Sequence, residues 1–325
     1  MTTMGNPRVV FFAVAFLASL GAVLGPSPAY GLACGDAIRT DTVLTADLGP
    51  CPGFGLFVAA PAVTLDLGGF TIRGSGGSVG VVADLASLTI EGPGTITNFG
   101  NGVRVGGRGV TVRDLNFTEN RAGIVLSSAS FPRIINNTID GGTHGETGIS
   151  VFEVGGAKIK GNVITGHSGS GIWVGLQSQS VIVLNSVKGN ATGLTYLEFE
   201  PASITIRDNE FSDNTQDGVS ITRAFSNLTL DLNTLNRNGG NGISVTGQAW
   251  GPLVIGDNVV DNNGNQGVAL TNISNISSSG AIQVIDNEVL NNAAVDLFWD
   301  GTGTNNCWKF NNFGSSDPAT LPACP

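Results

Sequence analysis

The stretch IRDNEFSDNTQDGVSI, from Ile206 to Ile221, returns in altered form as VIGDNVVDNNGNQGVAL, from Val254 to Leu270. Both segments contain Asp-Asn, a large apolar residue, a further Asn, and then Gly followed by a hydrophobic residue. Units that begin with such a Gly-hydrophobic pair recur every 21 to 29 residues, from Gly55 to a degenerate copy at Asp296. A repeat of this length is typical of a solenoid, in which each unit packs only on its neighbours.

An asparagine column stays in register with this repeat. Asparagine tolerates the left-handed backbone of a tight corner, and amides stacked at strand spacing can hydrogen-bond from coil to coil. The column therefore predicts a structural ladder rather than a ligand site. Its members stand two residues before a large apolar residue: Asn137, Asn162, Asn185, Asn209, Asn233, Asn258, Asn287 and Asn311. A second column, five residues later, is expected to cap the next corner more loosely: Asn190, Asn214, Asn238, Asn263 and Asn292.

Apolar residues alternate over short segments of each unit, which predicts strands, and none of the units has the spacing of a helix. Leucine-rich repeats need a leucine consensus that these units lack, and a propeller blade needs about 40 residues. We therefore predict an all-β fold, a single-stranded right-handed parallel β-helix of about 11–12 coils. The expected inward residues are Ile149, Val151, Ile172, Val174, Val219, Ile221, Ile243, Val245, Ile159, Ile206, Leu230, Ile255, Phe117, Ile139, Ile164, Phe211 and Val289.

The composition is that of a folded, acidic protein. Of 325 residues, 41% are hydrophobic and 12% are charged, which is too apolar for a disordered chain. The net charge is −10, so wholesale binding to nucleic acid or to an anionic membrane is not expected.

The first 31 residues have the pattern of a secretory signal peptide. Arg8 precedes the apolar run VVFFAVAFLASLGAVLG, and Ala29 and Gly31 are small residues before a cleavage point. The expected organisation is a signal peptide (1–31), an N-terminal cap coil (32–54), β-helix repeats (55–295), and a C-terminal coil and cap (296–325). We expect a secreted, periplasmic or cell-surface protein with no membrane span after cleavage, because no later segment is long and apolar enough.

Four cysteines flank the repeats, with Cys34 and Cys51 near the start and Cys307 and Cys324 near the end. Of the three possible connectivities, the two local pairs are the natural choice in an exported protein. Because the end coils of a solenoid have open strand edges, we interpret both pairs as staples on the end caps. A metal site lacks support, since there is no Cys-x-x-Cys and no nearby His.

The chain resembles the right-handed parallel β-helix proteins of the pectin-lyase-like superfamily, many of them secreted bacterial proteins. The resemblance lies in the opening CGDAIRTDTVLTADLGPCPGFGLFVAAPAVTLDLGGFTIRGSG and the ending NNCWKFNNFGSSDPATLPAC. Phe70 stands where many members have His. The resemblance implies the fold, but it does not imply one activity, because members include lyases, hydrolases, epimerases and proteins of no known activity.

The motifs of polygalacturonase-like enzymes are missing, since the sequence has no Asn-Thr-Asp and no Asp-Asp. Asp208, Asp257 and Asp286 form a column just before the ladder, where pectate-lyase-like proteins would need converging acids for calcium. Other coils interrupt the column, so no cofactor is predicted, and Ca²⁺ at these corners is the one alternative.

Five cations fall two and four positions before the ladder: Arg113, Arg133, Lys158, Lys160 and Arg207. They are either a solvated strand face or a groove for an acidic polysaccharide. Trp173 replaces a small outward residue and could stack on a sugar ring. We therefore predict that Arg133, Lys158, Lys160, Arg207 and Trp173 form one substrate-binding face.

His144 and His167 lie one repeat apart, so they are expected to be neighbours at one corner, beside Asp140, Glu146 and Glu153. A His–carboxylate pair is a legitimate acid–base hypothesis, and its catalytic candidates are His144, His167 and Glu153. The alternative is polar corner residues without a role. Two functions stay open, namely a protein that binds and could modify a polysaccharide, and a non-catalytic, adhesin-like surface rod. If the protein is an enzyme, a polysaccharide lyase, hydrolase or epimerase is expected.

Overall fold

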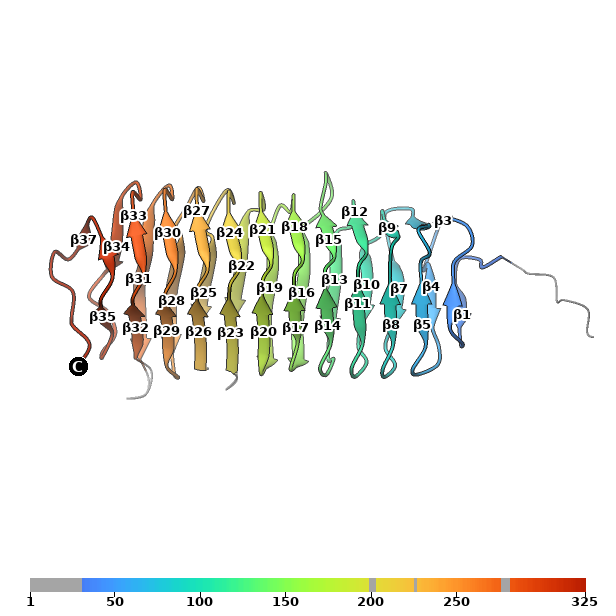
Figure 1. Cartoon of the computed structure of the whole chain (residues 1–325), viewed down its shortest axis with the longest axis horizontal. Coiled ribbons are helices and arrows are strands. Elements are labelled where there is room, and N and C mark those ends of the chain that lie inside the picture. The colour runs from blue at the N-terminus through green and yellow to red at the C-terminus, as the bar shows by residue number, and fades with distance from the viewer. Residues whose placement is uncertain (1–30, 199–202, 225–226, 276–280) are drawn as a thin grey trace, which may run out of the picture. The chain divides into compact units, whose positions relative to one another are not determined.

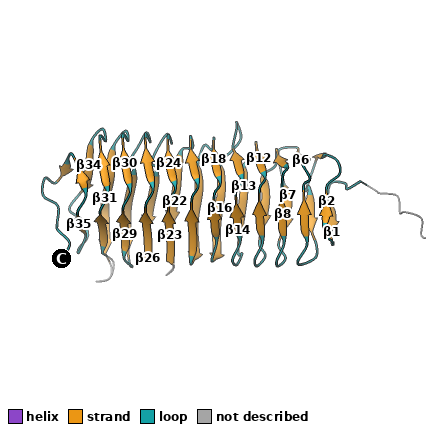
Figure 2. Cartoon of the chain, in the orientation of Figure 1, coloured by secondary structure: helices purple, strands orange, loops and turns teal. Residues whose placement is uncertain are grey.

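A computed structural model describes residues 31–198, 203–224, 227–275 and 281–325, and residues 1–30 of the expected signal peptide lie outside them. The described residues contain strands and no helix (Figures 1 and 2). Residues 32–325 form one compact unit, in which each coil contributes one strand to each of three parallel sheets. We call these sheets A, B and C, and we number the coils 1 to 12 along sheet B.

Sheet A has 13 strands: β1 (Asp36–Ile38), β4 (Leu56–Val58), β7 (Val79–Ala83), β10 (Asn101–Val105), β13 (Ala122–Ser127), β16 (Thr147–Gly155), β19 (Ser170–Ser178), β22 (Thr192–Leu197), β25 (Val219–Arg223), β28 (Ile243–Ala249), β31 (Gln266–Asn275), β34 (Val295–Trp299) and β37 (Ser316–Asp317). Sheet B has 12 strands: β2 (Thr42–Val43), β5 (Thr64–Asp66), β8 (Thr89–Glu91), β11 (Thr111–Arg113), β14 (Arg133–Ile135), β17 (Lys158–Lys160), β20 (Ser180–Val183), β23 (Ser203–Arg207), β26 (Asn227–Asp231), β29 (Leu253–Gly256), β32 (Ile282–Ile285) and β35 (Cys307–Lys309). Sheet C has 12 strands: β3 (Leu48–Cys51), β6 (Thr71–Gly74), β9 (Thr95–Thr97), β12 (Asn116–Thr118), β15 (Thr138–Asp140), β18 (Val163–Thr165), β21 (Ser186–Lys188), β24 (Glu210–Ser212), β27 (Thr234–Asn236), β30 (Val259–Asp261), β33 (Glu288–Leu290) and β36 (Asn312–Phe313). The predicted right-handed parallel β-helix is confirmed.

The core is a continuous column of inward side chains. All seventeen residues expected to face inward are buried, and strand pairing stacks them in register, as when Ile159 lies between Ile134 and Ile182. The Gly of the Gly-hydrophobic pair is required by close packing at the start of the sheet A strands. A Cβ at Gly148 would lie 2.5 Å from the carbonyl oxygen of Gly171 and 2.4 Å from the side chain of Ile164.

The first asparagine column forms the predicted ladder, at the corner between sheets B and C. From Asn137 to Asn311, each amide Nδ2 donates to the Oδ1 of the next Asn at 2.9 to 3.0 Å. The backbone N–H of each of these Asn residues up to Asn287 donates to the same Oδ1. Buried donors and acceptors are costly when unpaired, and the ladder satisfies them at every coil.

The second column is a full ladder at the corner between sheets C and A, so the expected looser cap was wrong. Four of its five side-chain contacts measure 2.9 Å and one measures 3.3 Å. It ends on Asp296, whose carboxylate accepts from Asn292, Gly314 and Ser315. Burial raises the pKa of Asp296, but these hydrogen bonds outweigh burial and hold the pKa below its usual value. An acceptor-only side chain suits the last step of a ladder of donors.

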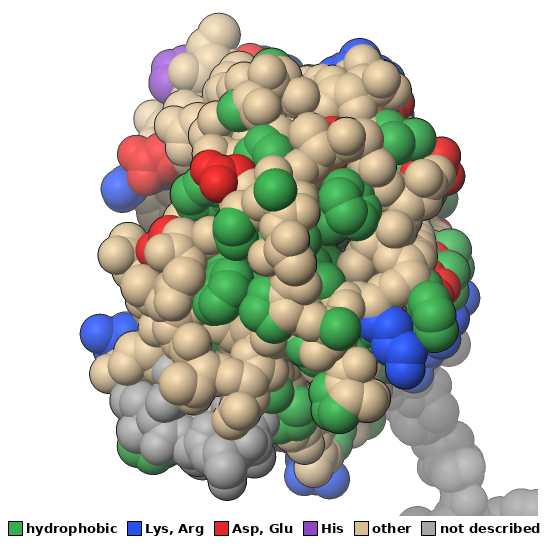
Figure 3. All heavy atoms as spheres, turned by 90° about the vertical axis from the view of Figure 1, so that its left-hand side faces the viewer, with side chains coloured by type: hydrophobic (Ala, Val, Ile, Leu, Met, Phe, Trp, Pro, Cys, Tyr) green, Lys and Arg blue, Asp and Glu red, His purple; other side chains and the backbone are tan. Residues whose placement is uncertain are grey.

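Both ends carry the predicted disulfides, Cys34–Cys51 and Cys307–Cys324. At the C-terminal end, the tail pairs with β35 through Trp308 N–H to Pro322 O and Cys324 N–H to Trp308 O. Figure 3 views this end and shows hydrophobic side chains over its middle, with charged side chains towards the rim.

Candidate functional site

Four of the predicted binding residues lie on sheet B. Strand pairing places Arg133 beside Lys158, Ile135 beside Lys160, and Val183 beside Arg207. Paired residues of adjacent strands are about 4.8 Å apart, and both neighbours of Arg133 and Lys158 in their outward row, Thr111 and Val181, are uncharged. Arg133, Lys158, Lys160 and Arg207 therefore lie on one sheet, and their role in substrate binding stays a prediction.

Their ion pairing separates these cations into two groups. Arg113 contacts Glu91 and Asp114, and Arg207 contacts Asp208. In contrast, Arg133, Lys158 and Lys160 form no ion pair among the described residues.

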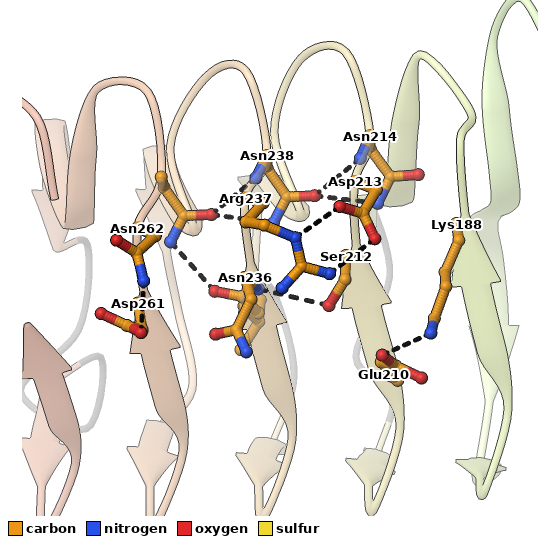
Figure 4. A network of polar contacts seen from close by, with 12 residues as sticks. Lys188, Glu210, Ser212, Asp213, Asn214, Asn236, Arg237, Asn238, Asp261 and Asn262 are labelled. Atoms are coloured by element: carbon orange, nitrogen blue, oxygen red, sulfur yellow. Dashed lines mark hydrogen bonds and ion pairs between the residues drawn. The ribbon is translucent and has the colours of Figure 1, made fainter. Parts of the chain in front are cut away.

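Cations elsewhere on the coils are neutralised by neighbours. On sheet C and its corner, Lys188 pairs with Glu210 at 2.5 Å and Arg237 with Asp213 at 2.7 Å (Figure 4). The Arg237 guanidinium holds the pKa of Asp213 below its ordinary value. Pairing with a carboxylate is thus common on this acidic chain, and the three cations of sheet B depart from it.

Arg108 and Phe131 extend this group at the corner between sheets A and B. The guanidinium of Arg108 lies 4.8 Å from the ring centroid of Phe131, and Phe131 is 49% exposed. The ring also lies across Gly156, because a Cβ there would be 2.5 Å from it. Phe131 and Gly156 stand two residues before Arg133 and Lys158. We call Arg108, Arg133, Lys158 and Lys160 the cationic patch.

The patch holds most of the Arg and Lys residues that form no ion pair in the part of the chain that the structure describes. Beyond residue 31 there are 14 Arg and Lys residues, 15 in all less Arg8. Seven of these 14 form no ion pair within the described part of the chain. Four of the seven are the patch, and the others, Arg39, Arg73 and Lys309, lie in the first two coils and the last. Like charges on paired strands destabilise a sheet, so the arrangement favours an anionic ligand.

Trp173 lies on sheet A, so the prediction of a single binding face was wrong for this residue. Its strand neighbours are Ser150 and Thr195, and its ring stacks on that of Phe152 with centroids 6.2 Å apart. The physical reason is register. Outward residues after the Gly-hydrophobic pair belong to sheet A, whereas those before the ladder Asn belong to sheet B.

His144 finds a carboxylate, but not one of those expected. Its Nδ1 lies 3.0 Å from Glu119 of the preceding coil, and Thr143 donates to the same carboxylate through its N–H and its hydroxyl. The hydrogen bond with His144, followed by those from Thr143, lowers the pKa of Glu119. Glu146 pairs with Arg121 instead. The result is an exposed His–carboxylate pair on a turn.

His167 lies at the same corner as His144, as expected, but its ring bonds to Asn190 whereas His144 bonds to Glu119. His167 is 2% exposed and begins the second ladder, because its Nδ1 lies 3.0 Å from Asn190 Oδ1. An amide oxygen only accepts, so Nδ1 carries the proton. The ring packs against Gly141 and Gly145, where an added Cβ would lie 2.9 Å from it. A buried ring of this kind cannot reach a substrate.

The burial of His167 predicts acid sensitivity. Burial lowers its pKa, more than the hydrogen bond with Asn190 and the charge of Asp140 raise it. Below a pH of about 6.5 the unfolded chain binds a proton that the folded chain does not, so stability falls as pH falls. His167→Asn retains a ladder amide. Between pH 7.5 and 5.5 we expect its free energy of unfolding to fall by up to about 1.4 kcal/mol less than that of the parent protein. Denaturant unfolding at both pH values measures this difference, and equal losses would contradict it.

Glu153 lies in β16 with a left-handed φ of 53° and accepts a hydrogen bond from Ser128 at 3.0 Å. No His lies among its described hydrogen-bond partners, and its catalytic role stays a prediction. Asp208, Asp257 and Asp286 occupy left-handed corner positions. Within the described residues, no three His, Cys, Asp or Glu side chains are grouped so as to hold a metal ion. Calcium at these corners also stays a prediction.

A family comparison addresses the whole solenoid. The family described as right handed beta helix region matches residues 94–222 and 144–289, which together span more than half of the chain. The chain belongs to this family. The described residues of this β-helix protein contain no helix that is long and apolar enough to cross a membrane. No curated protein matches it in sequence.

Several solved structures share the fold of this β-helix protein at low identity. The Azotobacter vinelandii mannuronan C-5 epimerase AlgE4 A-module is 17% identical with a TM-score of 0.66, over 87% of this chain and 88% of its own. The periplasmic alginate epimerase AlgG is 14% identical with a TM-score of 0.53, over 86% and 77%. Pectate lyase Pel9A is 13% identical with a TM-score of 0.56, over 88% and 79%. These likenesses confirm the fold that the pectin-lyase-like resemblance implied.

Proposed function

We propose that this β-helix protein binds an acidic polysaccharide through the cationic patch, outside the cytoplasm. The observation that carries the proposal is the set of four cations that have no ion-pair partner among the described residues, on consecutive coils of an acidic chain. Arg108 and Arg133 can hold carboxylates through two parallel hydrogen bonds, whereas Lys158 and Lys160 act as point charges.

Two further observations support this proposal. Proteins of the same fold are described as acting on mannuronan, alginate and pectate, which are chains of acidic sugars. The two disulfides are of the kind that forms in oxidising compartments, where such polymers occur. The proposal concerns binding. A reaction would need an acid or base beside the patch, and His144 lies at a different corner of the coil.

Binding of residues 32–325 to polyuronate, to a neutral glucan and to a sulfated glycan tests the proposal. We expect polyuronate binding that weakens as sodium chloride rises from about 50 to 500 mM, because salt screens exposed charges. Lys158→Ala combined with Lys160→Ala should lower the affinity about 10- to 100-fold.

Lys188→Ala is the matched control, since it removes an exposed but ion-paired lysine from sheet C. It should leave the affinity unchanged. If the folded parent protein binds none of the three glycans, the proposal is wrong, and a surface rod without a sugar ligand becomes the better account.

A further inference from the structure

An aromatic pair on sheet A faces away from the cationic patch but belongs to the same region of the solenoid. Phe152 is in coil 6, as are Lys158 and Lys160, and Trp173 is in coil 7. The indole lies over the backbone of Gly175, because a Cβ there would be 2.6 Å from the Trp173 ring. Phe152 stacks beside it and is 38% exposed. Partly exposed aromatic rings suit the C–H face of a sugar.

The corner between this aromatic pair and the patch is short and consists of small residues. In coil 6 it consists of Gly155, Gly156 and Ala157, which have no long side chains, and the partly exposed Phe131 ring of the preceding coil lies over Gly156. Lys158 follows Phe152 by six positions, so the two sites are at most about 22 Å apart along the backbone. A short stretch of polysaccharide could cover that path.

Charges on one outward row of sheet B disfavour a route along the solenoid axis on that row. In the row that contains Arg113, Lys160 and Arg207, acidic side chains precede the cations and one follows Arg207. Those acids are Asp66 and Glu91 before the cations, and Asp231 after them. An anionic chain on this row would meet carboxylates in both directions, whereas the row of Arg133 and Lys158 continues into uncharged residues on both sides, Thr111 and Val181. Between Phe152 and Lys158 of coil 6, the crossing to sheet A passes one carboxylate, Glu153, which lies next to Phe152 and can accept hydrogen bonds from sugar hydroxyls.

We propose that Phe152, Glu153 and Trp173 form a second subsite, which takes an uncharged sugar of the same chain that the patch holds. The ligand class is then a mixed polysaccharide, with acidic residues over sheet B and a neutral residue over sheet A. This inference rests on the proposed function, because it assumes that the patch holds the acidic part. It extends that function from charge recognition to recognition of a particular sequence of sugars.

Calorimetric titration with two polymers of equal charge density tests this inference. One is a uronate homopolymer with part of its carboxylates esterified, and the other alternates uronate with a neutral sugar. We expect the alternating polymer to bind about tenfold more tightly, and Trp173→Ala or Phe152→Ala to remove that advantage. The affinity for the homopolymer should stay within about twofold. Trp250→Ala, which removes an exposed Trp outside both sites, is the matched control and should retain the tenfold preference.

The outcomes separate the two proposals. If Trp173→Ala leaves the affinity for both polymers unchanged while Lys158→Ala still weakens them, the second subsite is wrong and the patch stands. If Trp173→Ala weakens both polymers equally, the subsite does not select a neutral sugar, and that assignment is overturned. Absence of binding by the folded parent protein would overturn both.

Discussion

Replacing Asn162 by Ala is expected to lower the free energy of unfolding by about 3 to 5 kcal/mol. Asn162 is fully buried in the first ladder, two residues after Lys160. Its Oδ1 accepts from the N–H and the Nδ2 of Asn137, and its own Nδ2 donates to Asn185 and to Ile134. The substitution leaves these buried groups unpaired, and each costs about 1 to 3 kcal/mol.

Denaturant unfolding followed by circular dichroism measures this loss. Thr138→Ala is the matched control, because it shortens an exposed side chain near the same corner and should change stability by less than about 0.5 kcal/mol. Equal stability of the Asn162→Ala and parent proteins would show that the ladder does not carry the predicted stability. Because the ladder fixes the corner next to Lys160, we also expect weaker polyuronate binding.

Removing the N-terminal disulfide, by Cys34→Ser with Cys51→Ser, is expected to cost about 3 kcal/mol. The two cysteines are 17 residues apart in sequence, and a cross-link over a loop of this size restricts the unfolded chain by about that amount. Loss of the staple also frees the first coil, whose outer strand edges no other coil covers. Unfolding midpoints of the double variant and the parent protein, measured in oxidising buffer, test this. Reductant should lower the parent protein's midpoint by more than the double substitution does, because it also opens Cys307–Cys324. Equal midpoints of the double variant and the parent protein in oxidising buffer would contradict the prediction.

The sequence predicted the scaffold because a solenoid repeats its local rules. Alternation identified the inward residues such as Ile159, and the asparagine columns identified both corners. The same register also contains a signal that places His167 correctly, since it follows Asn162 by five positions, as Asn190 follows Asn185. That position belongs to the second ladder, and a histidine there serves as its first donor.

The site was predicted only in part, because the length and sequence of the corners vary from coil to coil, whereas the strands repeat. Arg108 and Phe131 lie on the corner between sheets A and B. This corner has a different number of residues in different coils, and no repeated residue type identifies equivalent positions in it. Glu119 precedes His144 by 25 residues, which is one coil length, so the repeat itself could have predicted that the two side chains lie close together. Whether a cation is neutralised by its neighbours depends on side-chain positions, and no repeat pattern gives these.

The most direct test of the proposed binding site is a map of lysine labelling by an activated oligouronate. Beyond residue 31 the chain has only four lysines, Lys158, Lys160, Lys188 and Lys309. An oligouronate carrying an amine-reactive ester should modify Lys158 and Lys160 in preference to the other two, and unmodified oligouronate in excess should suppress this labelling. Mass spectrometry of the digested protein gives the result. Equal labelling of all four lysines, or labelling that competitor does not suppress, would contradict binding at the cationic patch.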